Sequence, residues 1–382
     1  MMNNMLIIRQ LTALSILAIA AASFADDGVP AVAPDSIRVS DKEIETLLTP
    51  ILEKHKVPGI VAGVVEPQGL TAVGAVGLRK IGSGELVTVN DKVHLGSNTK
   101  AMTATRIAML VEEAKLSWQS TVGEVFADAK TGVHPDFLGV TLEQLLTHRA
   151  GLPANVGYRT VKSAELVAER EVVVKKMFSS APVHPPGTKF LYSNAGYIAA
   201  GHMAERVTGA SWEELMTEGL FTPLKMSSAG YGFAGTAGQV DQPWGHNTMF
   251  GNPLPLQSDN AAVLGPAGTV HCTLADWAKF VVLHLEGARG NGRLLKPEMF
   301  KRLHEPPAGG DYAMGWVIVE RPWAKGRVLM HSGSNTMWFA TVAIAPERGM
   351  AFLSAVNCGG KAGQEACDEA LTALIQREPR EP

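Results

Sequence analysis

The stretch Leu95–Ala104, LGSNTKAMTA, runs on into TRIAMLVEE and places a lysine three residues after a serine. Ala, Met, Arg, Leu and Glu favour helices, so a helix is predicted over about 98–114. Residues three apart on a helix share a face, so Ser97 and Lys100 would point the same way. A serine needs a base to become a nucleophile, and a lysine can be that base only if burial or nearby positive charge lowers its pKa. Taken alone, S-x-x-K is a weak signal.

A second candidate segment is PPGTKFLYSNAGY at 185–197. Its Pro-Pro-Gly predicts a turn, and a helix is predicted to follow over about 194–207. A Tyr192 phenol with a lowered pKa could accept the proton of Ser97, and the Asn194 amide could bind the substrate. The structural alternatives are a half-buried loop tyrosine and a helix N-cap asparagine.

The third segment is His331-Ser332-Gly333, which ends the apolar run RVLMHSG at 327–333. This run predicts a strand, and a glycine at its end lets a substrate approach the backbone closely. The alternative for His331 is a polar residue on an edge strand.

The rest of the chain predicts an α+β fold. Ser40 is the expected cap of a helix that ends near Lys56, and Pro67-Gln68-Gly69 is expected to join the first two strands. Neighbouring strands linked by short turns predict an antiparallel sheet, flanked by helices from both ends of the chain. The predicted strands are 60–66, 70–78, 313–320, 327–333, 339–346 and 350–357, and the further predicted helices are 142–147, 163–178, 211–219 and 364–376. The domains expected from this pattern are a sheet domain of 26–90 and 258–382, an inserted helical domain of 91–257, and an active site between them.

Composition limits the possible partners. The chain of 382 residues is 46% hydrophobic and 19% charged, with a formal net charge of -3. These values are typical of a core-forming protein and give no basic footprint for nucleic acid.

There is no C-x-x-C and no H-E-x-x-H, so neither a metal nor another cofactor is expected. Cys358 and Cys367 could pair in an oxidising compartment; the alternative is inert buried thiols.

Residues 1–25 differ from the rest. Arg9 is their single charge, an apolar run spans Leu11–Ala22, and Ser23-Phe24-Ala25 precedes Asp26. This pattern predicts a secretory signal peptide cleaved near Ala25, and the alternative is an uncleaved anchor. The expected location is therefore periplasmic or secreted, with no membrane span in the mature protein.

Together, the S-x-x-K, Y-x-N and H-x-G segments resemble the serine β-lactamase and penicillin-binding protein superfamily. Within it they are similar to the branch of class C β-lactamases, DD-peptidases and family VIII esterases. Further segments support the resemblance: VPGIVAGVV at 57–65, LEQLLTHRAGLP at 142–153, GPAGTVHCTLADWAKF at 265–280 and YAMGW at 312–316. The resemblance implies the β-lactamase/transpeptidase-like fold.

The resemblance also implies roles for site residues. Ser97 would be acylated, while Lys100 and Tyr192 would share the general-base and general-acid work. The backbone N–H groups of Ser97 and Ser334 would form the oxyanion hole. Asn194 would bind the substrate amide, and the remaining substrate-binding residues would be His331, Gly333 and Ser334.

Several residues depart from the family pattern. Ala150 stands where the family often has serine, and Val270 and His271 interrupt another motif. Met337 and Trp338 are bulky and could narrow the cleft. His331 replaces the lysine of class C β-lactamases. A histidine is mostly neutral at pH 7 unless its surroundings raise its pKa, so this exchange is expected to remove a positive charge.

The function implied is that of a secreted serine hydrolase that forms an acyl-enzyme with a small ester, an amide or a D-amino-acid peptide. The partner is thus a small-molecule or peptide substrate, and the sequence does not determine the oligomeric state. One alternative is a class C-type β-lactamase, and another is a penicillin-binding protein that acylates slowly or not at all.

Overall fold

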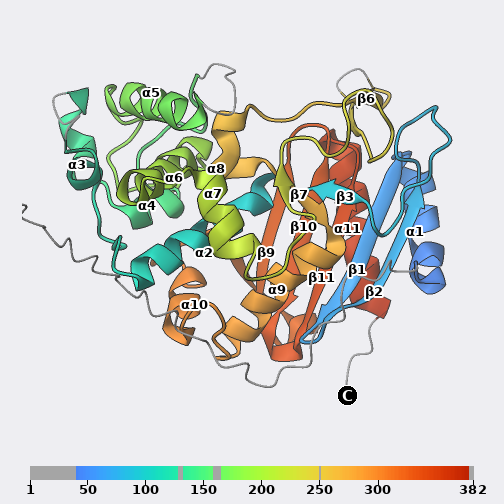
Figure 1. Cartoon of the computed structure of the whole chain (residues 1–382). Helices are drawn as coiled ribbons and strands as arrows, with labels where there is room; N and C mark the ends of the chain where they lie inside the picture. Colours follow the sequence, from blue (N-terminus) through green and yellow to red (C-terminus); the bar gives the residue numbers. More distant parts are fainter. Residues whose placement is uncertain (1–39, 128–131, 158–164, 249–250, 378–382) are drawn as a thin grey trace, which may run out of the picture. The chain divides into compact units, whose positions relative to one another are not determined.

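Both ends of the chain contribute to one six-stranded antiparallel sheet in the computed structural model. The structure describes residues 40–127, 132–157, 165–248 and 251–377, all within one compact unit, Pro34–Pro382. The predicted signal peptide of residues 1–25 lies outside the described residues. The strand order is β2-β1-β11-β10-β9-β8, so the N-terminal hairpin pairs with the last strand of the chain (Figure 1). The strands are β1 Gly59–Glu66, β2 Gly69–Gly77, β8 Val317–Arg321, β9 Gly326–Ser334, β10 Phe339–Ala345 and β11 Met350–Val356.

This sheet confirms the predicted antiparallel arrangement. Short connections join β1 to β2 and, in turn, β8 to β9, β9 to β10 and β10 to β11, while β1 and β11 pair although they come from opposite ends of the chain. The register pairs Ile60 with Val356 and Ala340 with Gly333. β10 and β11 are almost wholly buried, because helices cover both faces of the sheet. The terminal helices α1 (Lys42–His55) and α11 (Gly360–Arg377) lie on one face, and α9 (Leu274–Ala288) lies on the other (Figure 1).

Two details of the helices around the sheet differ from expectation. The cap of α1 is Asp41, whose Oδ1 accepts from Glu43 N at 2.9 Å, whereas the Ser40 hydroxyl accepts a hydrogen bond from Ala75 N. The sequence analysis also gave no helix for α9 or for α10 (Pro297–Leu303). Most residues of α9 are buried, and its partly exposed residues Ala275, Lys279, Val282 and Glu286 recur every three or four positions, a helical period that the sequence analysis did not use.

The helical part centres on α2 (Thr99–Glu112), in which every residue from Thr99 to Leu110 is buried. Helices far apart in sequence surround it, so its first turn is held from several sides. The other helices of this part are α3 Val122–Val125, α4 Leu142–Leu146, α5 Leu166–Phe178, α6 Asn194–Thr208, α7 Trp212–Met216 and α8 Gly265–Gly268. Three short strands, β3 Lys92–His94, β4 Gly230–Tyr231 and β7 Val270–Thr273, form a second sheet, and β5 Gly245–Asn247 pairs with β6 Leu254–Leu256. The division into the two predicted domains stays a prediction.

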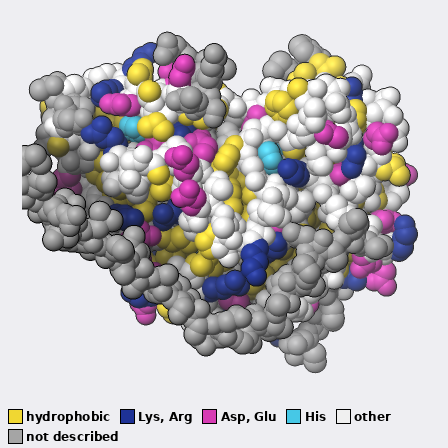
Figure 2. Space-filling model, in the orientation of Figure 1, with side chains coloured by type: hydrophobic (Ala, Val, Ile, Leu, Met, Phe, Trp, Pro, Cys, Tyr) yellow, Lys and Arg dark blue, Asp and Glu magenta, His cyan; other side chains and the backbone are white. Residues whose placement is uncertain are grey.

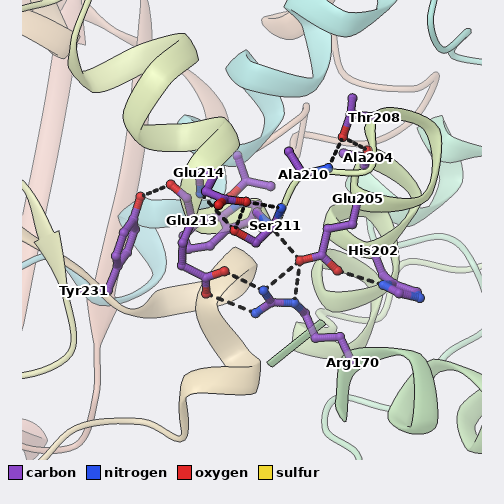
Figure 3. A network of polar contacts seen from close by, with 12 residues as sticks. Arg170, His202, Ala204, Glu205, Thr208, Ala210, Ser211, Glu213, Glu214 and Tyr231 are labelled. Carbon is purple, nitrogen blue, oxygen red and sulfur yellow. Dashed lines mark hydrogen bonds and ion pairs between the residues drawn. The ribbon is translucent and has the colours of Figure 1, made fainter. Parts of the chain in front are cut away.

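A buried ion network connects α5, α6 and α7 (Figure 3). Arg170 is fully buried, and its Nη2 lies 2.7 Å from Glu205 Oε1 and 2.5 Å from Glu213 Oε2. Glu205 also contacts His202 Nδ1 at 2.7 Å and accepts from Trp212 N at 2.9 Å. With so many partners, the buried charges are compensated, and they fix how the three helices pack.

The three cysteines do not form a disulfide. Cys272, Cys358 and Cys367 are buried free thiols, so the possible Cys358–Cys367 disulfide is not formed. None of the helices in the described ranges is both long and apolar enough to cross a bilayer.

Candidate active site

Ser97 lies in a single 3₁₀ turn, η1 (Gly96–Asn98), that leads directly into α2. Gly96 has a φ of 51°, a left-handed conformation that favours glycine. The Asn98 side chain donates to Leu95 O at 2.8 Å and to Ala340 O at 3.1 Å, which fastens the turn to strand β10. Ser97 is half-buried while its neighbours are buried, so the serine is accessible on a rigid support.

Lys100 Nζ lies 3.1 Å from Ser97 Oγ, as the spacing on one helical face predicted. The lysine is fully buried, and its Nζ also contacts Asn194 Oδ1 and Ala267 O, each at 2.7 Å. Both of these partners are uncharged carbonyl oxygens. Burial therefore lowers the pKa of Lys100 well below its ordinary value, because desolvation disfavours the ammonium form.

Tyr192 precedes α6 and lies over the lysine, with Lys100 Nζ 4.8 Å from the centre of its ring. The sequence analysis made Tyr192 a possible proton acceptor on the condition that its pKa is lowered, and this condition is not met. Burial raises the pKa of Tyr192 to about 12, although a hydrogen bond with Ser97 acts in the opposite direction. The phenol is therefore protonated at neutral pH and can donate a proton, while Lys100 is the better proton acceptor.

Asn194 is the first residue of α6, and both ends of its amide have partners. Its Oδ1 accepts from Lys100, and its Nδ2 donates to Asn155 Oδ1 at 2.8 Å. The cap of the helix is instead Ser193, whose hydroxyl accepts from Gly196 N at 3.1 Å. The alternative role of Asn194 as the N-cap of α6 is therefore excluded, because Ser193 is the cap.

The end of strand β9 packs directly against the turn that holds Ser97. A Cβ at Gly333 would lie 2.1 Å from Leu95 O and 2.4 Å from Ser97 N, and a Cβ at Gly96 would lie 2.4 Å from Ser334 N. Only glycine fits at both positions, because a side-chain carbon would overlap the facing backbone. The backbones that carry the N–H groups of Ser97 and Ser334 are therefore in close contact, and the oxyanion hole that these groups would form stays a prediction.

His331, two residues before Gly333, is buried with 5% of its surface exposed. Its Nε2 lies 3.1 Å from the hydroxyl of Tyr312, and its Nδ1 has no hydrogen-bond partner among the described residues. Burial, and then the charge of Lys100, lower the pKa of His331 to about 3. The imidazole is therefore neutral at physiological pH, and direct contact between His331 and a substrate stays a prediction.

An aromatic cluster around Lys100 was not assigned from the sequence. The ring of His148 lies between those of Tyr192 and Tyr312, with centroid distances of 4.4 and 4.5 Å. Its Nδ1 accepts from Ser193 N at 3.1 Å. Burial lowers the pKa of His148 well below its ordinary value, so it adds no charge beside the lysine. His148 and Tyr312 lie in the segments LEQLLTHRAGLP and YAMGW, which the sequence analysis used only to support the family resemblance.

These residues come together from six separate segments: η1 with α2, the loop after α4, the start of α6, α8, the end of β9 and the loop before β8. Figure 2 shows the surface indented between the side that carries α5 to α8 and the side that carries the β5–β6 hairpin. Exposed apolar side chains, Leu254 and Leu256, lie on that hairpin. Chemically, the arrangement offers a hydroxyl beside an amine of lowered pKa, a phenol, and two neighbouring backbone N–H groups. No group of three or more His, Cys, Asp or Glu residues placed to hold a metal ion occurs within the described ranges.

Comparison with known proteins agrees with this geometry. Unguisins hydrolase ungD of Aspergillus violaceofuscus is 31% identical over 49% of this chain, which spans about a third of that relative's length (34%). Penicillin-binding protein 4 of Amycolatopsis lactamdurans is 25% identical over 80% of this chain and 82% of its own.

Solved structures share the fold. The octameric penicillin-binding protein homologue from Pyrococcus abyssi aligns with a TM-score of 0.71 at 23% identity, covering 89% of this chain and 78% of that one. SurE, solved with D-Leu, aligns with a TM-score of 0.71 at 20% identity, covering 87% and 74%. The family model described as Beta-lactamase matches residues 44–377, which is most of the sequence. The chain therefore belongs to the beta-lactamase family.

Proposed function

We propose that this protein is a serine hydrolase that works through an acyl-enzyme on Ser97. The observation that carries the proposal is the set of partners around Lys100. A neutral amine has two N–H donors and one lone pair. Asn194 Oδ1 and Ala267 O are both acceptors at 2.7 Å and use the two N–H groups. The lone pair is left to accept the hydroxyl hydrogen of Ser97, whose Oγ lies 3.1 Å from Nζ.

In the proposed acylation step, neutral Lys100 takes the proton of Ser97 Oγ as that oxygen attacks the substrate carbonyl carbon. The carbonyl electrons move onto oxygen, and the N–H groups of Ser97 and Ser334 stabilise the oxyanion. Lys100 is now an ammonium and passes a proton to Tyr192 as the phenol protonates the leaving group. The leaving group departs, and Ser97 remains as an ester.

Deacylation reverses these proton movements with water. Lys100 is neutral again after acylation, so it can accept a water proton while the oxygen attacks the ester carbon. The Ser97 oxygen then leaves with a proton supplied through Tyr192. A single amine–phenol pair can therefore serve both half-reactions, since it returns to its starting state after each one.

For the substrate, we propose a small ester, an amide or a D-amino-acid peptide, in the manner of an esterase or a D-peptidase such as a carboxypeptidase. Two observations support this choice over a class C-type β-lactamase. His331 is neutral where class C enzymes carry a lysine charge, so an anionic β-lactam lacks one attraction. Among the similar proteins, one is named a hydrolase of unguisins and another was solved with D-Leu. We also propose that the protein is exported after cleavage near Ala25.

The first test is covalent labelling of Ser97. The purified protein is treated with a fluorophosphonate probe, and the labelled peptide is located by mass spectrometry. We expect one label on Ser97, none in Ser97→Ala, and normal labelling in Ser179→Ala, which removes an exposed serine at the end of α5. An unlabelled wild type, or a label elsewhere, would contradict the proposed nucleophile.

The second test is a hydrolysis panel of short-chain p-nitrophenyl esters, a D-Ala-D-Ala peptide with its L-Ala-L-Ala counterpart, and a chromogenic cephalosporin. We expect turnover of the esters or the D-peptide to exceed that of the cephalosporin. A preference for the cephalosporin would favour the β-lactamase alternative. A protein that labels on Ser97 but turns over nothing in the panel would favour the penicillin-binding alternative.

A further inference from the structure

A buried carboxylate outside the three motifs lies behind the proposed oxyanion hole. Asp259 belongs to the segment between β6 and α8, which crosses above β3 and β7 in Figure 1. Its side chain is 5% exposed, although the surrounding loop is largely at the surface. Burying a carboxylate this deeply is costly unless hydrogen-bonding partners compensate for the lost hydration.

One oxygen of Asp259 contacts two separate parts of the molecule. Its Oδ1 accepts from Asn335 Nδ2 at 2.8 Å. The same Oδ1 lies 2.8 Å from His94 Nε2, at an angle outside the range of a regular hydrogen bond. Asn335 directly follows Ser334, and His94 lies three residues before Ser97. The carboxylate thus bridges the two segments whose backbone N–H groups face the proposed oxyanion.

The contact with His94 continues to the nucleophile turn. His94 Nδ1 accepts a hydrogen bond from Gly96 N at 3.1 Å, so in a neutral ring the proton is on Nε2, the side that faces Asp259. Asp259 therefore favours the tautomer that leaves Nδ1 free to accept. This in turn holds Gly96 in its left-handed conformation, with the Ser97 N–H presented next to it.

The hydrogen bond from Asn335 to Asp259 supports the second proposed oxyanion donor, the N–H group of Ser334. Asn335 Oδ1 accepts from Met337 N at 3.2 Å, and the Ser334 hydroxyl accepts from Thr336 N at 3.0 Å. Thr336 has a φ of 73°, so this turn is conformationally demanding and needs support. With its amide nitrogen on Asp259, Asn335 fixes the turn that immediately follows Ser334.

We propose that Asp259 is a positioning residue that aligns the two oxyanion N–H groups through His94 and Asn335. This inference rests on the proposed function, because an oxyanion forms only if Ser97 is acylated. Asp259 itself touches no reacting atom. Its removal should therefore impair stabilisation of the transition state, while leaving substrate binding and the Ser97–Lys100 pair in place.

The variants are Asp259→Ala, Asp259→Asn and Asp259→Glu, with Asp241→Ala as a matched control. Asp241 is an exposed carboxylate that accepts hydrogen bonds from Thr236 in a neighbouring loop. The Asn variant keeps an oxygen acceptor of the same shape, whereas Glu keeps the charge but displaces the oxygen by one methylene. Each variant is assayed for kcat and KM on an active ester and on its thionoester. Because sulfur accepts hydrogen bonds weakly, the ratio of the two rates reports on the oxyanion hole.

For Asp259→Ala we expect kcat on the ester to fall by about 10- to 100-fold, with KM within about threefold, since small misplacements of donors have effects of this size. The ester-to-thionoester ratio should fall with it, and Asp259→Asn should recover at least about tenfold. Asp241→Ala should match the wild type. Asp259→Glu should also lower the ratio, so the proposal remains testable if the Ala variant does not fold.

An unchanged ratio in Asp259→Ala or Asp259→Glu would overturn the inference, and so would an Asn variant no better than Ala. Failure of the proposed function is recognised separately. In that case the wild type itself shows no fluorophosphonate label on Ser97 and no ester turnover, and neither do the variants at position 259.

Discussion

The proton acceptor for Ser97 can be identified from pH dependence, because the structure shifts the pKa values of the two candidates in opposite directions. Burial raises the pKa of Tyr192 to about 12 and lowers that of Lys100. At pH 7, a phenol with that pKa is ionised in only about one molecule in 10⁵, a cost of about 7 kcal/mol if the phenolate were required. Deprotonating Lys100 to the neutral amine costs far less free energy, because its pKa is lowered.

The perturbations are Tyr192→Phe and Lys100→Met, assayed as kcat/KM against pH from 5 to 10 at constant ionic strength. The wild-type rate should rise with pH as Lys100 loses its proton, and reach a plateau below the ordinary pKa of a lysine. Tyr192→Phe should lower the plateau by about 100-fold and keep the rise, because Lys100 is still present. Lys100→Met should lower the rate by about 10⁴-fold and abolish the rise.

Because the lysine is replaced by a side chain of similar length in a buried site, folding is checked by circular dichroism and a thermal melt. The double variant should be little worse than Lys100→Met alone, since groups that share one proton transfer are not additive. The reasoning would be refuted by a wild-type rate that still climbs at pH 10, or by a pH rise that survives in Lys100→Met and disappears in Tyr192→Phe.

Gly333→Ala should abolish ester hydrolysis, because its Cβ would lie 2.1 Å from Leu95 O; activity within tenfold of wild type would contradict the close contact. Arg170→Met should lower the free energy of unfolding in urea by about 3–5 kcal/mol, since it leaves the buried carboxylate of Glu205 and the partly exposed one of Glu213 without their cation, while the exposed Lys175→Met should cost at most about 1 kcal/mol. His331→Lys should shift kcat/KM from uncharged esters toward anionic β-lactams by about 10- to 100-fold, and an unchanged ratio would show that His331 does not set substrate charge. Intact-mass measurement of protein exported by a bacterial host should give an N-terminus at Asp26, whereas a chain that retains its first residues in the membrane fraction would favour an anchor.

Local spacing was enough to predict the features that depend on neighbours in the sequence. The hairpins of β1–β2 and β10–β11 follow from short apolar runs separated by turn residues. The pairing of Ser97 with Lys100 follows from their separation of three on one helix, and the structure gives 3.1 Å between their reacting atoms. The three motifs, in their order along the chain, were also sufficient to indicate the family.

The protonation states depended on the tertiary structure, because a pKa responds to burial rather than to the identity of sequence neighbours. A Tyr192 phenol could accept the Ser97 proton only with a lowered pKa, yet the surrounding rings of His148 and Tyr312 exclude water and raise the pKa of Tyr192. The neutral state of His331, which the sequence left dependent on its surroundings, likewise follows from its burial.

Contacts between distant segments could not be predicted either. Lys100 meets Asn194 across 94 residues and Ala267 across 167, and Asp259 meets Asn335 across 76. No local pattern in the sequence encodes which of the many polar side chains will meet after the chain folds. The sequence alone therefore determined the candidate nucleophile, its neighbouring lysine and the antiparallel sheet. Only the packing of remote segments decided that Lys100, rather than Tyr192, is the better proton acceptor, because burial sets the pKa of both groups. The same packing places Asp259 behind the proposed oxyanion hole.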